Sequence, residues 1–287
     1  MDGEITEVYA LRYAARPGLT ASEAFHMYGL YGESDVAVGM DYFFWLIRSR
    51  TRTIVVDCGY SETTALKRDR RVDTAPRELL ARMGVDPAAV DDVVLTHMHF
   101  DHVGNTDLFP NAAFHMARAE FAYWTGRHRD RPAFSWPVEP AEVRAVEALE
   151  REGRLHLLGD SAEVAPGVRA TRFPGHTPGQ LVTEVAVGGK RIVLASDAIH
   201  LYDEIRRDRP FFIFTDIAAM FDSYQALREL DARADTEVIA GHDPAVAAGY
   251  AEVAENCFDL TRPWDGASAL SERATALRTP DDTSASL

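Results

Sequence analysis

The sequence predicts an α/β protein in which two halves each combine a mixed β-sheet with flanking helices. Three observations support this fold class. Short apolar runs typical of strands alternate with amphipathic stretches typical of helices along the chain. Histidines and aspartates that could bind metal directly follow several apolar runs, as expected for loops at strand ends. A chain of 287 residues with 46% hydrophobic content can bury a large core, so we expect one domain.

The first half is expected to alternate strands and helices in the following order. The predicted strands are 5–13, 42–49, 52–57, 92–95 and 113–116. The predicted helices are 74–83, 118–125 and 141–152. Thr74 could cap the first of these helices and Gly84 could end it. The third is the clearest, because Val143, Val146 and Leu149 group on one side of it.

The second half is expected to be richer in strands. The predicted strands are 155–158, 168–173, 181–187, 191–195 and 237–240, with a helix over 215–232. Gly188-Gly189 lies between two of the strands and indicates a tight hairpin turn. From about Ala267 the sequence becomes small and polar, so we expect a domain over 1–266 and a disordered tail over 267–287.

The net charge of −15 narrows the possible partners. Nucleic acid and anionic membranes would be repelled on average, and no apolar stretch is long enough to span a bilayer. A small-molecule substrate is therefore expected, whereas the sequence does not distinguish a monomer from a homodimer. Only two cysteines occur, Cys58 and Cys257, and no segment resembles a secretory signal. Unpaired thiols in a cytoplasmic protein are expected.

The most informative segment is His97-Met-His99-Phe-Asp101-His102, directly after the apolar run at 93–95. Alternation along an extended segment points His97, His99 and Asp101 the same way, and a turn at Asp101 lets His102 face a second cation. Imidazole and carboxylate together suit zinc, iron, cobalt or manganese, and not calcium or magnesium. The alternative is a surface loop that is merely rich in histidine.

Three further candidate ligands follow segments with strand character. They are His176 in Pro174-Gly175-His176, Asp197 after 191–195, and His242 after Gly241. Taken singly each has an ordinary alternative, because Gly-His is a common turn and Asp197 could cap a helix. Glycine before each histidine is expected where the backbone closely approaches a buried cation. The joint order of these motifs favours a metal centre.

The motifs in this order resemble those of the metallo-β-lactamase superfamily, over roughly residues 5 to 260, and within it the N-acyl homoserine lactonases. The resemblance implies an αβ/βα sandwich and two divalent metal ions, with zinc favoured. The implied ligands are His97, His99 and His176 for one ion, and Asp101, His102 and His242 for the other. Asp197 would bridge both ions along with a hydroxide. Asp57, in an early Asp-x-Gly turn, would support the ligands from behind.

Such a centre implies opening of a lactone ring by the bridging hydroxide. Asp101 or Asp197 would relay the proton to the leaving ring oxygen. The resembled lactonases carry a tyrosine three residues after the bridging aspartate, and its hydroxyl contacts the substrate carbonyl. This chain has His200 there instead. His200 could donate through a ring N–H, and Tyr202 could compete for the role.

Two segments that contain aromatic residues are expected to form the walls of the substrate pocket. Met27 and Tyr28 lie in a glycine-punctuated stretch after the first strand, and Phe211 and Phe212 follow the Asp197 loop. Either pair could line an apolar groove. For both pairs the alternative is packing in the core, which is the more common place for aromatic runs.

Other enzymes of the superfamily differ from lactonases in their metal ligands or in their C-terminal region. A glyoxalase-II-like thioesterase shares the ligands but adds a basic C-terminal region, whereas only 45 residues follow His242 here. True β-lactamases of the superfamily lack the bridging aspartate that Asp197 supplies. Diiron oxidoreductases of the superfamily carry glutamate where this chain has His99. A hydrolase is therefore expected, and a hydrolase of another cyclic ester or amide remains an alternative.

Overall fold

The computed structural model describes residues 3–263. The tail predicted over 267–287, and the domain boundary predicted at 266, lie outside the described residues.

The strands are β1 (Ile5–Ala15), β2 (Asp41–Ser49), β3 (Thr53–Val56), β4 (Asp92–Val94), β5 (Ala113–Ala117), β6 (Leu155–Leu158), β7 (Ser161–Ala165), β8 (Val168–Arg172), β9 (Leu181–Val187), β10 (Lys190–Ser196), β11 (Thr236–Ala240), β12 (Tyr250–Ala254) and β13 (Cys257–Pro263). The helices are α1 (Ala21–Ala24), α2 (Glu62–Lys67), α3 (Pro76–Arg82), α4 (Arg118–Trp124), α5 (Pro132–Ser135), α6 (Pro140–Arg151), α7 (Asp203–Arg207), α8 (Ile217–Asp231) and α9 (Pro244–Gly249).

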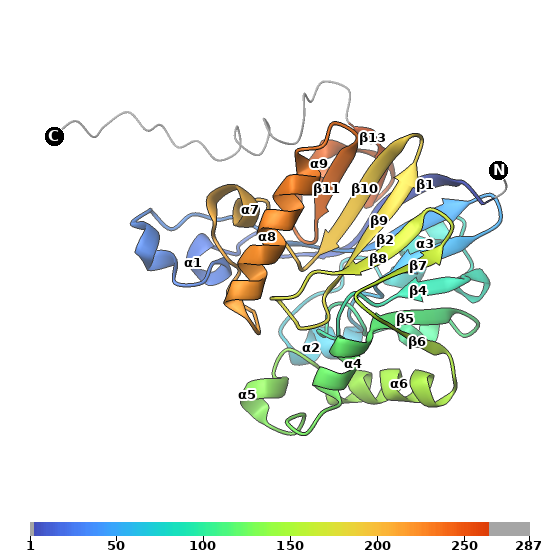
Figure 1. Ribbon diagram of the computed structural model, residues 1–287, viewed down its shortest axis with the longest axis horizontal. Helices are drawn as coiled ribbons and strands as arrows, with labels where there is room; N and C mark the ends of the chain where they lie inside the picture. The colour runs from blue at the N-terminus through green and yellow to red at the C-terminus, as the bar shows by residue number, and fades with distance from the viewer. Residues whose placement is uncertain (1–2, 264–287) are drawn as a thin grey trace.

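The strands form two mixed groups that meet at one edge (Figure 1). In the first group, β1, β2 and β3 pair antiparallel, and β3 to β6 pair parallel. In the second, β7 to β10 pair antiparallel and β11 adds in parallel to β10. A single parallel bridge between Ile5 and Val187 joins the groups. The two mixed sheets expected from the sequence are therefore present, linked at this bridge.

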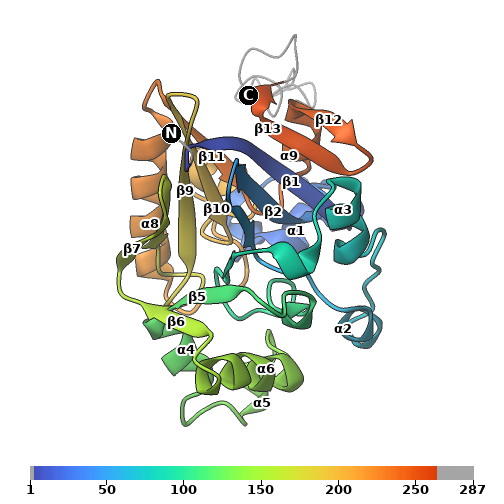
Figure 2. The ribbon, with the colours of Figure 1, turned by 90° about the vertical axis from the view of Figure 1, so that its right-hand side faces the viewer.

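Helices cover the outer faces of the strands. In Figure 2, α8 lies on one side and α2 and α3 on the other, with the strands of both groups between them. α8 packs against β11, α3 against β1, and α6 against β6. The interior is filled by large buried side chains such as Trp45, Phe43 and Phe114. No helix within residues 3–263 combines the length and apolar character that a bilayer crossing requires.

Parallel pairing places the candidate ligands together. Chain segments leave β3 and β4 at the same end, and likewise β10 and β11, because parallel strands share the direction of their carboxyl ends. Asp57 and His97 follow the first pair of strands within a few residues, and Asp197 and His242 follow the second. The loops of both groups converge at this edge of the strands.

Most predicted elements are confirmed within a few residues, including the hairpin at Gly188-Gly189, where both residues have positive φ. One helix start is wrong: α3 begins at Pro76 with Ala75 as its cap, and Thr74 is buried before it. Proline fits the first helical turn because no intrahelical partner is needed for its missing N–H. Several short elements were not predicted, namely α1, α2, α5, α7, α9, β7, β12 and β13.

Candidate metal centre

Four buried side chains form the first group of candidate ligands. The ligand atoms of His97, His99, His176 and Asp197 all lie within 4.8 Å of one another. His176 Nε2 is 2.8 Å from His99 Nδ1 and 3.3 Å from His97 Nε2. Three imidazole nitrogens that meet in this way in a dry site repel one another unless they share a proton or a cation. Their convergence fits a metal ion coordinated by three histidines.

Asp101, His102 and His242 form the second group, also buried and also within 4.8 Å of one another. Asp197 lies between the groups. Its Oδ1 is 3.2 Å from His102 Nε2 and 3.0 Å from His242 Nε2. Its Oδ2 is 3.3 Å from His176 Nε2. Each carboxylate oxygen of Asp197 therefore faces one group, which is the arrangement that a bridging ligand requires.

The donor set also fits two borderline cations. Five imidazoles and two carboxylates converge there, which suits zinc, iron, cobalt or manganese. His102 Nε2 is buried and has no hydrogen-bond partner among the described residues. Burial lowers the pKa of the His97 and His99 imidazoles well below the ordinary value, and that of His176 to about 3. Neutral imidazoles are the form that binds a metal.

Hydrogen bonds to the ring nitrogen that faces away from the group orient three of the imidazoles. His102 Nδ1 donates to Asp57 Oδ2 at 2.7 Å, which leaves Nε2 free to face the group. His176 and His242 likewise donate through Nδ1, to the backbone carbonyls of Ile213 at 3.0 Å and Asp41 at 2.8 Å. Bonds of this kind fix the tautomer that presents a lone pair to a metal.

Asp57 serves two ligands at once. Besides His102, it accepts hydrogen bonds from the backbone N–H and hydroxyl of Thr96, at 2.8 Å each. The hydroxyl of Thr96 in turn lies 3.1 Å from His97 Nδ1. Asp57 adopts a φ of 63°, a left-handed conformation that its short polar side chain tolerates. The structure thus places Asp57 behind two candidate ligands, in direct contact with His102 and linked to His97 through Thr96.

The glycines before the ligand histidines approach backbone, and not the cation site as the sequence suggested. A Cβ on Gly175, whose φ is 135°, would lie 2.3 Å from Met220 Cα. A Cβ on Gly241 would lie 2.5 Å from the carbonyl oxygen of Ser196. These glycines allow α8 and the end of β10 to pack against the ligand loops, so the earlier explanation is corrected.

His200 lies at the edge of the first group. Its Nε2 is 3.0 Å from Asp197 Oδ2, its Nδ1 is 3.3 Å from Glu204 Oε1, and its ring stacks on Phe211 at 3.7 Å between centroids. Burial lowers the pKa of His200, but the carboxylates of Asp197 and Glu204 outweigh this effect and raise it to about 9. The ring faces the same cavity as Asp101 and Asp197.

Tyr202 does not reach this cavity, and its predicted role as an alternative donor is wrong. Its hydroxyl donates to the carbonyl of Val238 at 3.2 Å and lies 3.4 Å from the N–H of Ala240. Tyr202 is the residue just before α7, and the turn into that helix directs its ring toward β11. Of the two candidates, the structure brings only His200 to the ligands.

A cavity of about 260 Å³ opens over the ligands. Its floor contains His99, Asp101, Asp197 and His200. Its walls are Arg16, Leu19, Met40, Tyr42, Arg68, Arg70, Phe100, Trp136, Pro137, Phe211, Phe212 and Ile213. Phe211 and Phe212 therefore occupy the wall position that the sequence suggested. Trp136 and Phe212 stack at 6.3 Å between ring centroids and are about half exposed.

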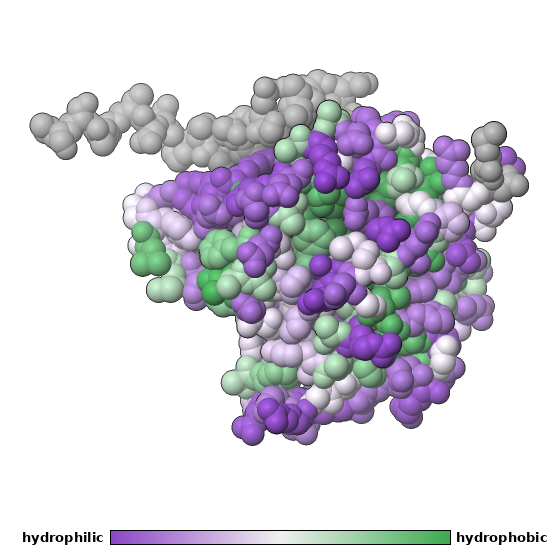
Figure 3. Space-filling view, in the orientation of Figure 1, coloured by the Kyte–Doolittle hydropathy of each residue, from purple (hydrophilic) through white to green (hydrophobic). Residues whose placement is uncertain are grey.

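Met27 and Tyr28 do not line the cavity, and this prediction is corrected. Met27 is 59% exposed, whereas Tyr28 is buried and donates its hydroxyl to the Ser34 carbonyl at 3.0 Å. Leu30 is also exposed. In Figure 3 apolar residues gather at the left end of the molecule, over the region where α1 lies in Figure 1. This segment turns its apolar side chains toward solvent or the core, and not toward the ligands.

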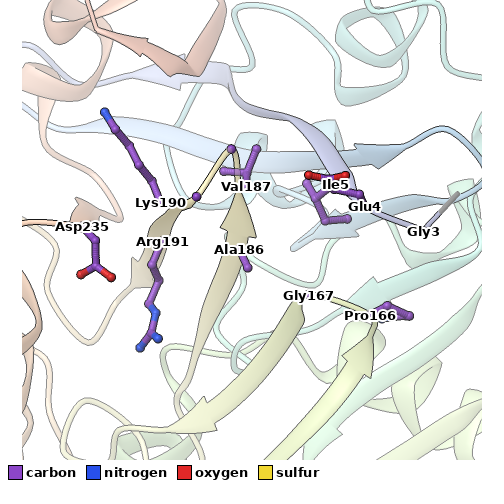
Figure 4. A pocket seen from close by; sticks show the side chains of 12 residues that line it. Gly3, Glu4, Ile5, Pro166, Gly167, Ala186, Val187, Lys190, Arg191 and Asp235 are labelled. Atoms are coloured by element: carbon purple, nitrogen blue, oxygen red, sulfur yellow. The ribbon is translucent and has the colours of Figure 1, made fainter. Parts of the chain in front are cut away.

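A larger hollow of about 710 Å³ lies elsewhere, beside the β9–β10 hairpin (Figure 4). It is lined largely by backbone and small residues, with charged side chains of Glu4, Lys190, Arg191 and Asp235 near it. None of the grouped histidines lines it. The smaller cavity over the ligands is the functional candidate because it combines convergent polar groups with apolar walls.

Glu120 on α4 was missed by the sequence analysis, although it ties two ligand loops together. Its buried carboxylate accepts hydrogen bonds from the backbone N–H of Met98 at 2.9 Å and of Gly179 at 3.0 Å. It also accepts one from Trp124 Nε1 at 2.6 Å, and Trp124 packs against the ring of His99. A single carboxylate therefore connects the His97–His99 segment to the loop that follows His176.

We expect Glu120→Ala to lower the free energy of unfolding by about 3 kcal/mol, because three N–H donors lose a buried acceptor. The same substitution should release metal at a lower chelator concentration, since the two loops lose their common anchor. Urea denaturation and chelator titration measure these effects. Glu150→Ala, on the exposed face of α6, is the matched control. Equal stability and metal retention in both variants would contradict this role of Glu120.

Comparison with known proteins agrees with this geometry. The family model described as the metallo-beta-lactamase superfamily matches residues 40–242. The N-acyl homoserine lactonase AttM of Azorhizobium caulinodans is 30% identical over 177 residues, 56% of this chain and 61% of that protein. An N-acyl homoserine lactonase of Bacillus sp is 28% identical over 167 residues, 58% and 60% of the two chains. This chain thus spans about three fifths of the length of these relatives.

Solved structures share the fold at lower identity. A quorum-quenching N-acyl homoserine lactone lactonase superposes with a TM-score of 0.65 at 20% identity, over 85% of this chain and 95% of that one. AidC, a dizinc quorum-quenching lactonase solved with the product N-hexanoyl-L-homoserine, superposes with a TM-score of 0.64 at 17% identity, over 85% and 92%. The sandwich, the ligand groups and the family match lead to one conclusion: the chain belongs to the metallo-beta-lactamase superfamily.

Proposed function

We propose that this protein is a hydrolase that uses two divalent metal ions to open the ring of a lactone, an N-acyl homoserine lactone or a related one. The observation that carries the proposal is the position of Asp197, whose two carboxylate oxygens each face one of the two ligand groups. The relatives named as N-acyl homoserine lactonases support the substrate class.

In this proposal, His97, His99 and His176 would hold one ion, Asp101, His102 and His242 would hold the other, and Asp197 would serve both. When bound, the ions lower the pKa of water and polarise the substrate carbonyl. Zinc is the proposed metal, because a set of five imidazoles and two carboxylates suits it. Asp57 holds His102 in the required tautomer from behind.

The protein side chains position the substrate and move the proton. Water adds to the lactone carbonyl carbon, the ring C–O bond breaks, and the ring oxygen takes a proton to give the hydroxy acid. His200 Nε2 donates a hydrogen bond to the carbonyl or leaving oxygen, because it borders the cavity beside Asp197. Asp101, on the cavity floor, relays the proton. Phe211 and Phe212 exclude water from the wall.

We also propose a cytoplasmic location. Cys58 and Cys257 are both buried and unpaired, and free thiols are typical of that reducing compartment. Burial raises the pKa of both thiols, which supports a packing role for them and not a nucleophilic one.

Purified zinc-loaded protein is expected to open N-hexanoyl homoserine lactone, with release of one proton per hydroxy acid formed. The measurement is a pH-indicator assay with mass spectrometry of the product. S-lactoylglutathione, a cephalosporin and a phosphodiester serve as comparison substrates for the thioesterase, lactamase and phosphodiesterase reactions. Turnover of S-lactoylglutathione without detectable opening of any lactone would overturn the proposal.

A further inference from the structure

Three arginines line the cavity over the ligands, and two of them already have acidic partners. Arg16 pairs with Glu23 at 2.7 Å. Arg68 pairs with Glu139 at 2.8 Å and lies 4.2 Å from the ring centroid of Phe100. Both guanidinium groups are therefore neutralised by the fold.

Arg70 differs from the other two. No carboxylate between residues 3 and 263 forms an ion pair with it. The side chain is half-buried, and its buried Nε has no hydrogen-bond partner among those residues. Its Nη1 donates to the backbone carbonyls of Arg68 and Asp69 at 3.3 and 3.2 Å. These bonds hold the group in place but leave its charge uncompensated. A partly buried cation without a counter-ion is costly. The chain carries a net charge of −15, yet none of its described carboxylates pairs with this guanidinium.

The surroundings of Arg70 could bind a substrate that has an anionic group at one end and is otherwise apolar. The hydroxyl of Tyr42 lies within hydrogen-bond reach of Arg70 and also borders the cavity. Elsewhere the cavity wall is aromatic, with Trp136 and Phe212 stacked on one another and half exposed. An acyl chain or ring could lie along the aromatic pair while a charged group meets the guanidinium. The planar fork of arginine matches a carboxylate in particular.

We propose that the natural substrate carries a carboxylate remote from the scissile carbonyl, and that Arg70 binds it. This inference rests on the proposed function and narrows its substrate class. Arg70 then acts as a specificity-determining residue, because a neutral acyl chain leaves its charge unpaired when the substrate is bound.

The test compares two lactones that differ only at the chain end, N-hexanoyl and N-adipoyl homoserine lactone. Wild type is expected to favour the carboxylate-ended adipoyl compound, mainly through a lower KM. In Arg70→Gln the ratio of kcat/KM for adipoyl over hexanoyl lactone should fall about 10- to 100-fold, the effect of losing one charged hydrogen bond. Arg70→Lys should keep part of the preference, because the charge remains without the fork.

Arg144→Gln is the matched control, since Arg144 lies exposed on α6 and its loss changes the net charge equally. It should keep the wild-type ratio. A wild type without preference for the adipoyl lactone, or an unchanged ratio in Arg70→Gln, would overturn the inference while leaving the lactonase proposal intact.

Calorimetry separates the two proposals independently of turnover. The ring-opened acids, N-adipoyl and N-hexanoyl homoserine, are titrated into wild type and Arg70→Gln. If no lactone is opened but N-adipoyl homoserine still binds about tenfold more tightly to wild type, the lactonase proposal fails and the role of Arg70 stands. Equal binding of both acids to both proteins would overturn that role.

Discussion

Replacing Asp197 with asparagine is expected to abolish lactone hydrolysis and to lower the metal content from two ions per chain. The neutral amide keeps the shape of the side chain but removes the negative charge that two cations share. Its NH2 group would also face ring nitrogens on one side, where an oxygen now lies 3.3 Å from His176 Nε2. His97→Ala and His176→Ala should have the same effect on activity, because each removes one of three imidazoles from the first group.

Elemental analysis of the purified protein and circular dichroism check this expectation together. Folded but inactive protein with reduced metal is the expected outcome for all three substitutions. The matched control is His156→Ala, which changes an exposed histidine on β6 that belongs to neither ligand group. Fully active wild-type protein that contains only trace transition metal would end the two-metal interpretation.

His200→Ala is expected to lower kcat about 10- to 1000-fold, the range for loss of one positioned hydrogen-bond donor. The metal content should not change, because His200 lies beside Asp197 but outside both ligand groups. Retention of metal thus separates a donor from a ligand. His200→Gln keeps an N–H donor without the ring and should recover part of the rate.

Tyr202→Phe is the control for this experiment. It removes only the hydroxyl that bonds to Val238 on β11, so we expect a loss of about 1 kcal/mol in stability with unchanged kcat. If Tyr202→Phe were the damaging substitution and His200→Ala nearly wild type, the assignment of the donor to His200 would be wrong.

The sequence indicated that the candidate ligands lie close together, because each follows a predicted strand, and the family resemblance supplied their division into two groups. A strand followed by a short loop fixes where His97, Asp197 and His242 emerge, and parallel pairing then brings them to one edge. The side chains that depend on distant neighbours could not be predicted. Glu120 is one acidic residue among many on a helix until Met98 and Gly179 come to face it.

The wrong predictions about the residues that line the cavity have similar causes. Tyr202 is close to His200 in sequence, but it is the residue at which the loop turns into α7. This turn directs its ring toward β11, where the hydroxyl bonds to Val238. The segment containing Met27 has no regular period, so its direction relative to the ligands was undetermined until the fold was known. Arg70 was missed for a related reason, because an unpaired charge is visible only once the partners of Arg16 and Arg68 are known.

The two walls of the cavity differ in how closely they are connected to the candidate ligands. The wall at 211–213 shares its backbone with the ligand shell, because the carbonyl of Ile213 orients His176. A substitution at Phe212 that shifts this backbone therefore threatens metal binding as well as substrate fit. Arg70 and Trp136 belong to segments that contribute no ligand. The carbonyl of the neighbouring Pro137 does accept a hydrogen bond from the N–H of Phe100 at 3.0 Å, but the side chains of Arg70 and Trp136 hold no candidate ligand in place. Changing either side chain should therefore alter substrate fit while the candidate ligands keep their positions.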